Sequence, residues 1–581
     1  MRKTLVAVAV IAAGALAYYQ WSGKAAGGID MPGLEYVPAD TVLLSAQVSP
    51  IDLTSYLSSL GLGPTSYDAQ MQQMFAELSL DMSDAPQKFL LELLHGYMKA
   101  LSEPESLTAS TGIKAQMRSL LYMVGVSPVY KIEIADETAF WQMFDQAEQA
   151  SGFNHIAQQL NDIKYRQYRL GDAEFTMDLL VTVQQGWATL TLSSDKFSPQ
   201  QLALVLQTET PEQNLANTDV LPTMLKKYQL NSDSFAFISF AQLSQVLTTK
   251  DGNRFAQNLQ TLFPAELDSG FAEWRTPACQ ADVTAITQSW PGIFMDNTFD
   301  MTDAASLKVA SRWLIPTDNS ETLTALNALR GFVPGHIKAP EASSLMHAAI
   351  GIDVAQLAPS IGTLWRGLTE PAYSCQPLAQ LQQSLKAQNP LAALAMAGMA
   401  NGVQGISVTI NDVQLDATTQ EMTKADGLLT LSAANARTLL DGLKAFYPPL
   451  AATPLPATGE ELDLTTVIPE LAITGLQPRL MMTDSHMLVF VGETAKTQAQ
   501  AVGNSVLEKN GLLHVGMDYG QFFQTLESTL LQSGEPIPAE FKQLSDNPIK
   551  LAVSLDIAPQ GVVIHTNMQT QQKPAATEAA K

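Results

Sequence analysis

The two cysteines of the chain, Cys279 and Cys375, are the residues whose type and number point most directly to chemistry. A tetrahedral metal site needs about four ligands, and two cysteines without nearby histidines fall short. A dithiol redox motif has the spacing C-x-x-C, whereas these residues stand 96 positions apart. In an oxidising compartment an even count of cysteines favours a bridge. We therefore predict a disulfide between Cys279 and Cys375.

The histidines do not form a recognisable ligand motif. None takes part in an H-E-x-x-H or H-x-H pattern with a nearby carboxylate. We interpret each as a packed or surface imidazole, although residues distant in the sequence can still assemble a site. The seven are His95, His155, His336, His347, His486, His514 and His565.

Other short motifs carry little weight. The chain has no G-x-S-x-G elbow. Ser193 and Lys196 match S-x-x-K without a companion motif, which we interpret as a chance match at a strand–helix turn. Segments 71–74 and 396–399 are M-x-x-M pairs that can bind Cu(I), but helix cores use the same spacing. The sequence predicts no catalytic residue, no cofactor-binding residue, no metal ligand and no cofactor.

Composition places the chain among folded, acidic proteins. Of its 581 residues 46% are hydrophobic and only 15% are charged, so disorder is not expected, and the length suggests several domains. The net charge is −24. A field of this sign repels phosphate backbones, which argues against nucleic acid as a partner, and it opposes binding to an anionic lipid surface.

The N-terminus has the pattern of a targeting segment. Arg2 and Lys3 precede an apolar run, and residues 15–17 fit a small-x-small cleavage site. Aromatic residues then follow at 18–21, which is typical of a membrane interface, and residues 4–21 are just long enough to cross a bilayer. We predict a signal-anchor over residues 1–21, with a cleaved signal peptide as the alternative. Both place the rest of the chain outside the cytoplasm.

One pattern recurs along the chain: a short apolar strand enters a polar turn and a helix follows. Ala241 and Ala355 open the same Ala-Gln-Leu triplet at an offset of 114 residues, and segments 329–334 and 443–448 match at that offset too. This indicates an internal duplication. The predicted fold class is α+β, with tandem repeats of strand–turn–helix units forming antiparallel sheets covered by helices.

The predicted organisation follows from these patterns. Residues 67–120 do not follow the strand–turn–helix pattern. We predict a mainly helical insertion there, which either covers one sheet face or forms a lid over an apolar groove. The predicted segments are a linker over 22–35, an α+β repeat region over 36–230, repeat units over 231–340 and 341–505, a partial repeat over 506–567 and a disordered tail over 568–581.

Segments 36–44 and 122–136, with the two isolated cysteines, make the chain similar to a group of uncharacterised bacterial envelope proteins. These proteins are N-terminally anchored and periplasmic and have repeated α+β regions. The resemblance implies a location and an architecture, and it supplies no catalytic residue.

Two functions remain open from the sequence. The first is a non-enzymatic periplasmic protein, anchored in the inner membrane through residues 4–21, that acts as a binding, scaffold or chaperone-like module. Its partners would be envelope proteins, lipid or peptide. The alternative is a periplasmic hydrolase whose site is dispersed along the chain. Metal handling through methionines is the weakest hypothesis.

Overall fold

The computed structural model describes residues 29–59, 69–82, 84–171, 177–302, 306–339, 344–390, 394, 398, 400–415, 422–444, 453–533 and 548–571. The chain divides into two compact units. Unit 1 contains the described residues up to Pro316 together with Tyr373–Leu378, and unit 2 contains the others. The division falls within the segment 231–340 that the sequence analysis treated as one repeat unit.

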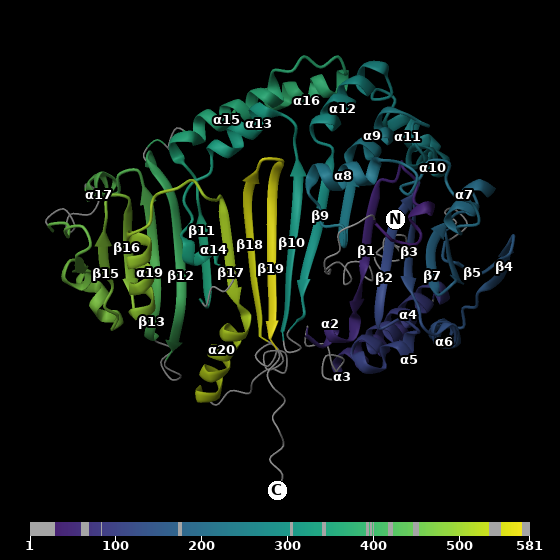
Figure 1. Cartoon of the computed structure of the whole chain (residues 1–581), viewed down its shortest axis with the longest axis horizontal. Coiled ribbons are helices and arrows are strands. Elements are labelled where there is room, and N and C mark those ends of the chain that lie inside the picture. Colours follow the sequence, from purple (N-terminus) through teal and green to yellow (C-terminus); the bar gives the residue numbers. More distant parts are fainter. Residues whose placement is uncertain are drawn as a thin grey trace, which may run out of the picture. The chain divides into compact units, whose positions relative to one another are not determined.

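Unit 1 is an α+β unit built on antiparallel strands (Figure 1). Neighbouring strands pair in the order β4–β5–β6–β7–β3–β2–β1–β8–β9–β10. The strands are β1 (Leu43–Asp52), β2 (Gln116–Val124), β3 (Ser127–Glu133), β4 (Ile156–Leu160), β5 (Ile163–Arg169), β6 (Asp178–Gln184), β7 (Trp187–Ser193), β8 (Ser234–Ser239), β9 (Gly292–Asp300) and β10 (Ser306–Pro316).

The helices of unit 1 begin at capping residues that the sequence supplies. Asp84, Asp136 and Ser239 accept hydrogen bonds from backbone N–H groups in the first turn of α4, α6 and α9. The helices are η1 (Leu34–Tyr36), α2 (Leu53–Ser59), α3 (Ala69–Asp81), α4 (Ala85–Leu101), η2 (Pro104–Ser106), α5 (Leu107–Thr111), α6 (Glu137–Ser151), α7 (Pro199–Val205), α8 (Val220–Tyr228), α9 (Phe240–Thr248), α10 (Arg254–Leu262), α11 (Pro264–Gly270) and α12 (Pro277–Ser289).

Unit 2 is also α+β and its strands are likewise antiparallel, in the order β14–β15–β16–β13–β12–β11–β17–β18–β19. The strands are β11 (Met346–Ile350), β12 (Val403–Leu415), β13 (Met422–Ala433), β14 (Glu461–Asp463), β15 (Arg479–Met482), β16 (His486–Val491), β17 (Leu513–Asp518), β18 (Ile549–Ala558) and β19 (Gly561–Gln571). The helices are α13 (Ser320–Ala328), α14 (Gly335–Lys338), α15 (Val354–Thr369), α16 (Gln376–Lys386, whose first residues belong to unit 1), α17 (Ala436–Lys444), η4 (Leu464–Thr466), η5 (Pro469–Thr474), α19 (Glu493–Gly503) and α20 (Tyr519–Ser533).

The cores lie where helices meet one face of these strands. In unit 1 one large cluster joins Leu44, Tyr122 and Phe235 on the strands to Leu204 and Leu221 on α7 and α8. In unit 2, α19 packs Ala495 and Ala499 on Leu428, Leu488 and Phe490 of β13 and β16; Figure 1 shows this helix lying across those strands. Helix α17 covers the opposite face of β15 and β16 through Ala436 and Leu440.

At both ends of the chain the structure differs from the predicted linker and tail. Met31 and Leu34, placed in a flexible linker, are buried in the core of unit 1 because their apolar side chains pack against it. Residues 568–571, placed in the disordered tail, complete β19 by pairing with β18. Residues 22–28 of the predicted linker and 572–581 of the tail lie outside the described residues.

The prediction of a transmembrane helix requires correction. In the part of the chain that the structure describes, none of the helices combines the length and the apolar character that crossing a bilayer demands. Residues 4–21, to which the anchor was assigned, lie outside that part.

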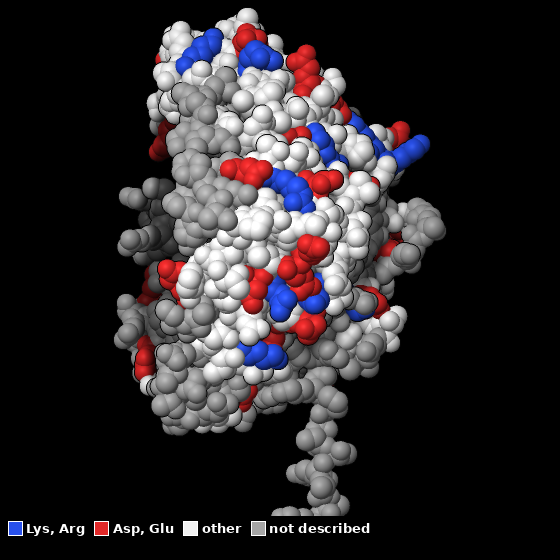
Figure 2. Space-filling model, turned by 90° about the vertical axis from the view of Figure 1, so that its left-hand side faces the viewer, with Lys and Arg blue, Asp and Glu red and all other residues white. Residues whose placement is uncertain are grey.

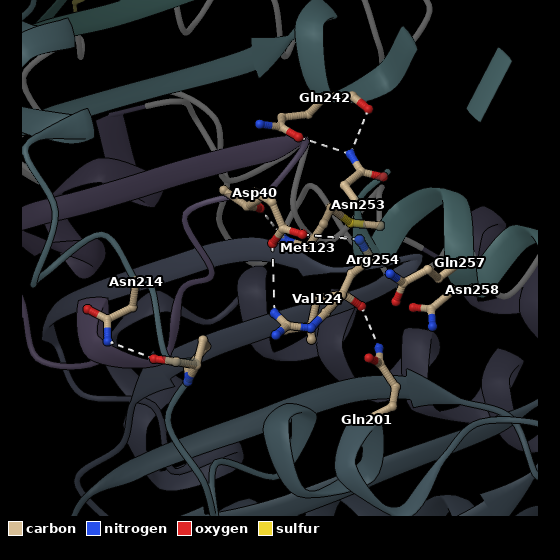
Figure 3. Close-up of polar contacts among 12 residues, drawn as sticks. Asp40, Met123, Val124, Gln201, Asn214, Gln242, Asn253, Arg254, Gln257 and Asn258 are labelled. Carbon is tan, nitrogen blue, oxygen red and sulfur yellow. Dashed lines mark hydrogen bonds and ion pairs between the residues drawn. The ribbon is translucent and has the colours of Figure 1, made fainter. Parts of the chain in front are cut away.

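A polar junction holds the β2–β3 turn of unit 1 (Figure 3). Gln201 Nε2 donates to Val124 O at 2.6 Å, and Asn258 Oδ1 accepts from Val126 N at 3.2 Å. Between them Gly125 has φ +59°, and a Cβ there would lie 1.7 Å from Asn258 Oδ1. The turn therefore needs glycine both for its left-handed conformation and for the close approach of α10.

We expect Gly125→Ala to destabilise unit 1 by more than the left-handed conformation alone costs, which is roughly 1–2 kcal/mol. Gly152→Ala is the matched control, because Gly152 has φ +73° and open space around a Cβ. Urea unfolding of both variants measures the difference. Equal losses of stability would show that the Asn258 contact imposes no constraint.

Candidate functional site: an aliphatic sheet face backed by buried histidines

Five neighbouring strands of unit 2, β13, β12, β11, β17 and β18, direct three rows of side chains to the same face. Side chains alternate between the two faces of a sheet, so cross-strand partners share a face. The rows are Leu431, Ile406, Ile350, Leu513 and Leu555; Leu429, Val408, Ala348, Val515 and Val553; and Gly427, Ile410, Met346, Met517 and Leu551. We call these fifteen residues the aliphatic face.

The aliphatic face is open over its central strands. Ile406 is 47% exposed, Ile350 46% and Val515 44%, and the remaining residues of β11, β12, β13 and β17 alternate between exposed and buried along each strand. Five strands span about 19 Å across, and three alternate residues span about 14 Å along a strand. The largest contiguous apolar patch on a soluble monomer measures roughly 300–600 Å² and is often an interaction or ligand site.

The opposite face of the same strands is largely polar, and it is buried on β11, β12, β13 and β17. It consists of the cross-strand rows Thr430, Ser407, Ala349, His514 and Ser554, and Leu428, Thr409, His347, Gly516 and Ala552. Antiparallel sheets usually show the reverse, with apolar residues packed inside and polar residues in water. Folding therefore leaves aliphatic groups in water and removes polar ones from it, which the packing of unit 2 alone does not explain.

Three histidines meet on this polar face under α14. The rings of His347 and His514 have centroids 5.2 Å apart, and His336 Nε2 lies 3.0 Å from Thr409 Oγ1. His347 Nδ1 is 2.8 Å from Ser344 Oγ. The ring of His347 lies over Gly516, where a Cβ would be 2.4 Å from Nε2. These residues come from α14, β11 and β17, so sequence spacing does not reveal the cluster.

The histidine cluster is held neutral by its surroundings. Burial and, to a smaller extent, the neighbouring His347 ring lower the pKa of His336 and of His514 from 6.5 to about 4. Burial also lowers the pKa of His347. Lys338 adds to the effect on His514. One buried ring nitrogen of each histidine has no hydrogen-bond partner, namely His336 Nδ1, His347 Nε2 and His514 Nδ1.

The other histidines occupy separate places. His95 stacks on Phe75, His155 Nδ1 lies 2.7 Å from Glu148, and His486 Nδ1 lies 2.9 Å from Ser432 Oγ. His565 lies on β19. Among the described residues, no group of three or more His, Cys, Asp or Glu side chains is arranged to hold a metal ion.

The remaining motif residues do not assemble a site. Ser193 ends β7 and is buried, whereas Lys196 is exposed beyond it. Lys196 N donates to Ser194 Oγ at 3.3 Å, as a turn would require. Residues 71–74 belong to α3, and Met396 and Met399 lie outside the described residues.

The structure contains the Cys279–Cys375 disulfide that the sequence analysis predicted. Cys279 lies in the first turn of α12 and Cys375 directly precedes α16, and both are fully buried. Cys375 N donates to Asp282 Oδ2 at 2.8 Å, which ties the two helix starts together. Since Tyr373–Leu378 belong to unit 1, the bond is internal to that unit.

Charge on the surface is mixed. Figure 2 shows acidic and basic side chains interspersed on the face that it draws, with neutral surface between them. In unit 2, Glu461 pairs with Arg479 at 3.2 Å and with Lys496 at 2.8 Å, and both cations lower the pKa of its carboxyl. The net charge of −24 is thus not gathered into one field on that face.

The recurring strand–turn–helix pattern of the sequence did not reveal the aliphatic face. A signal was present, because Met346, Ala348 and Ile350 alternate with His347, as Leu513, Val515 and Met517 do with His514. Alternation alone does not say which set faces water.

Comparison with known proteins finds no significant match: no family model, no curated protein sequence and no solved structure matches the chain. The site is therefore interpreted from its own chemistry.

The histidine cluster predicts acid-sensitive stability. The folded pKa of His336 and His514 lies below the unfolded value, so folding favours the neutral rings. This stability is complete above about pH 6.5 and falls as pH decreases toward 4, by about 1.4 kcal/mol per pH unit for each ring. Urea unfolding gives the free energy of unfolding at pH 6.5 and at pH 4.5. We expect the difference between these two values to be smaller in His514→Gln than in the wild type.

His95→Gln is the control, because His95 is partly exposed on α4 and far in the sequence from the cluster. This variant should show the same pH dependence of the free energy of unfolding as the wild type. If the free energy of unfolding falls equally with decreasing pH in both variants, the acid sensitivity arises from other groups.

Proposed function

We propose that the protein is a non-enzymatic binding module that holds the aliphatic chain of a lipid on the aliphatic face of unit 2. The observation that carries this proposal is the exposure of the aliphatic rows on β11, β12, β13 and β17 while their polar neighbours are buried. Covering aliphatic surface with a hydrocarbon chain removes it from water, at roughly 25 cal/mol per Å².

The chemistry of the face favours a lipid chain over a protein surface. Its fifteen residues are Leu, Ile, Val, Met, Ala and Gly only. They offer no side-chain hydrogen bond, no charge and no aromatic ring. Protein interfaces concentrate their binding energy in Trp, Tyr and Arg. A saturated hydrocarbon chain needs none of these groups, so every part of it can be bound by the aliphatic side chains of this face.

The alternative function, a hydrolase with a dispersed site, has one observation in its favour. Ser344 Oγ and His347 Nδ1 form a hydrogen-bonded pair at 2.8 Å, as a nucleophile and its base would. Both side chains are buried, and His347 Nε2 has no partner where a triad places an orienting carboxylate. The pair is better explained as packing on the covered face.

We also propose that the two units are copies of one ancestral unit. The strand orders β5–β6–β7–β3–β2–β1–β8–β9–β10 and β14–β15–β16–β13–β12–β11–β17–β18–β19 correspond strand by strand. This longer duplication supports the predicted tandem repeats, with the unit rather than the single strand–helix segment as the element copied.

For location we propose the bacterial periplasm, where disulfides form and persist. The buried Cys279–Cys375 bond supports an oxidising compartment. There the module would bind envelope lipid, with envelope proteins or peptides as the other partners of the binding-module hypothesis.

Binding is tested with cis-parinaric acid, a C18 fatty acid that fluoresces when its chain enters an apolar site. We expect saturable binding to the full chain and competition by palmitate. Val515→Glu places a charge in the middle row of the face and should weaken binding at least tenfold, about 1.4 kcal/mol.

Val506→Glu is the matched control, since Val506 is 73% exposed and does not belong to the aliphatic face. It should bind as the wild type does. If Val515→Glu and Val506→Glu bind equally well, the face is not the site. Binding of an apolar peptide without any binding of the fatty acid would instead indicate a protein partner.

The location is tested by alkylating cells quenched in acid, before and after reduction. We expect Cys279 and Cys375 to become alkylated only after reduction, because their bond is complete in an oxidising compartment. Two free thiols in the unreduced sample would contradict the periplasmic proposal.

A further inference from the structure

Unit 1 contains an apolar pocket that the aliphatic face does not involve. Helix α4 forms one wall and α6 another, and strands β3, β6 and β7 form the floor. The pocket has a volume of about 140 Å³. Among the described residues, no charged side chain lines it, and Tyr97 and Tyr130 are the lining residues that carry a polar side-chain group.

The floor and the wall on α6 are rigid. Phe144, Phe140 and Leu179 are buried, and the Phe140 and Phe144 rings lie 5.2 Å apart between centroids. Phe144 also stacks on Tyr168, with centroids 6.0 Å apart. Aromatic packing of this kind holds the shape of the pocket when it is empty.

The pocket holds water poorly. A buried water makes about three hydrogen bonds, whereas a dry cavity of about 150 Å³ lined by Leu, Ile and Phe takes up benzene or xenon. Burial raises the pKa of Tyr97 to about 12, so its hydroxyl stays neutral near the opening. The lining thus favours a compact hydrocarbon group over water.

The pocket opens beside α4, where Leu93, Leu94 and Tyr97 are partly exposed. Of the floor, Leu179 and Ile132 are buried, whereas Tyr130 and Leu190 are partly exposed as well. A ligand can therefore insert one end and continue outward past α4. The volume is too small for a whole lipid, whereas the end of an alkyl chain fits it.

We propose that this pocket binds the terminal part of an alkyl chain. The proposal takes only the class of ligand from the proposed function, and it concerns a separate site in unit 1. It also gives the helical insertion a role, because α4 belongs to the segment predicted either to cover a sheet face or to form a lid over an apolar groove.

The test uses 10-bromodecanoic acid, whose terminal bromine quenches tryptophan fluorescence on contact. The Trp141 ring has its centroid 5.3 Å from that of Phe140 and 5.9 Å from that of Phe144, so it reports on the pocket. We expect saturable quenching of the full chain. Trp141→Phe should lose that quenching while calorimetry still detects binding of the acid.

Two variants fill the pocket. Leu190→Phe enlarges a residue of the floor, and Leu93→Phe enlarges one at the opening, where partial exposure makes it tolerable for folding. Each should weaken the saturable quenching at least tenfold at an unchanged melting temperature. Leu78→Phe is the matched control, because Leu78 is exposed on α3 and does not line the pocket.

Val515→Glu separates this proposal from the proposed function, since it alters only the aliphatic face of unit 2. It should leave the quenching of Trp141 intact. The pocket proposal is overturned if the wild type shows only linear quenching, or if folded Leu93→Phe keeps the wild-type quenching. Loss of quenching in Val515→Glu would also overturn it.

Discussion

The two-residue alternation of side chains in β11 and β17 is the constraint on which unit 2 depends. His347 and His514 share their strands with the aliphatic residues, so the two sets must face opposite sides. A shift of one residue would place the imidazoles in water and the aliphatic chains under α14. Thr409 and Ser344, which contact the histidines, oppose that shift because they would lose these hydrogen bonds.

This orientation is costly on both faces. Three imidazoles each keep one buried nitrogen without a partner, and burying an unsatisfied polar atom disfavours folding. The aliphatic rows stay in water, which also disfavours the unit in isolation. A chain laid on the aliphatic face relieves the second cost without touching the first. Ligand binding would then stabilise the folded unit by mass action.

The sequence predicted the bond between Cys279 and Cys375, the α+β class and the antiparallel pairing, because cysteine number, turn spacing and alternation are local signals. It did not predict the burial of Met31, because the Gly-rich residues around it are typical of a linker and the core against which it packs is formed by distant residues. It also did not predict the aliphatic face. Which side of a strand is covered depends on α14 and α19, whose positions are tertiary information.

If the two units are copies, as proposed, the helices that cover the sheet account for the difference between their apolar sites. In unit 1 the strands β3, β6 and β7 have α6 over one face, and α4 from the insertion closes over it to leave a pocket of about 140 Å³. In unit 2 the corresponding helix is α17, which packs over β15 and β16. The strands from β13 to β18 keep their aliphatic rows uncovered by the described helices. The same sheet architecture therefore gives a small apolar pocket where α4 closes over α6, and a broad open face over β13, β12, β11, β17 and β18. Hydrocarbon chains suit both sites, since one takes the end of a chain and the other takes its length.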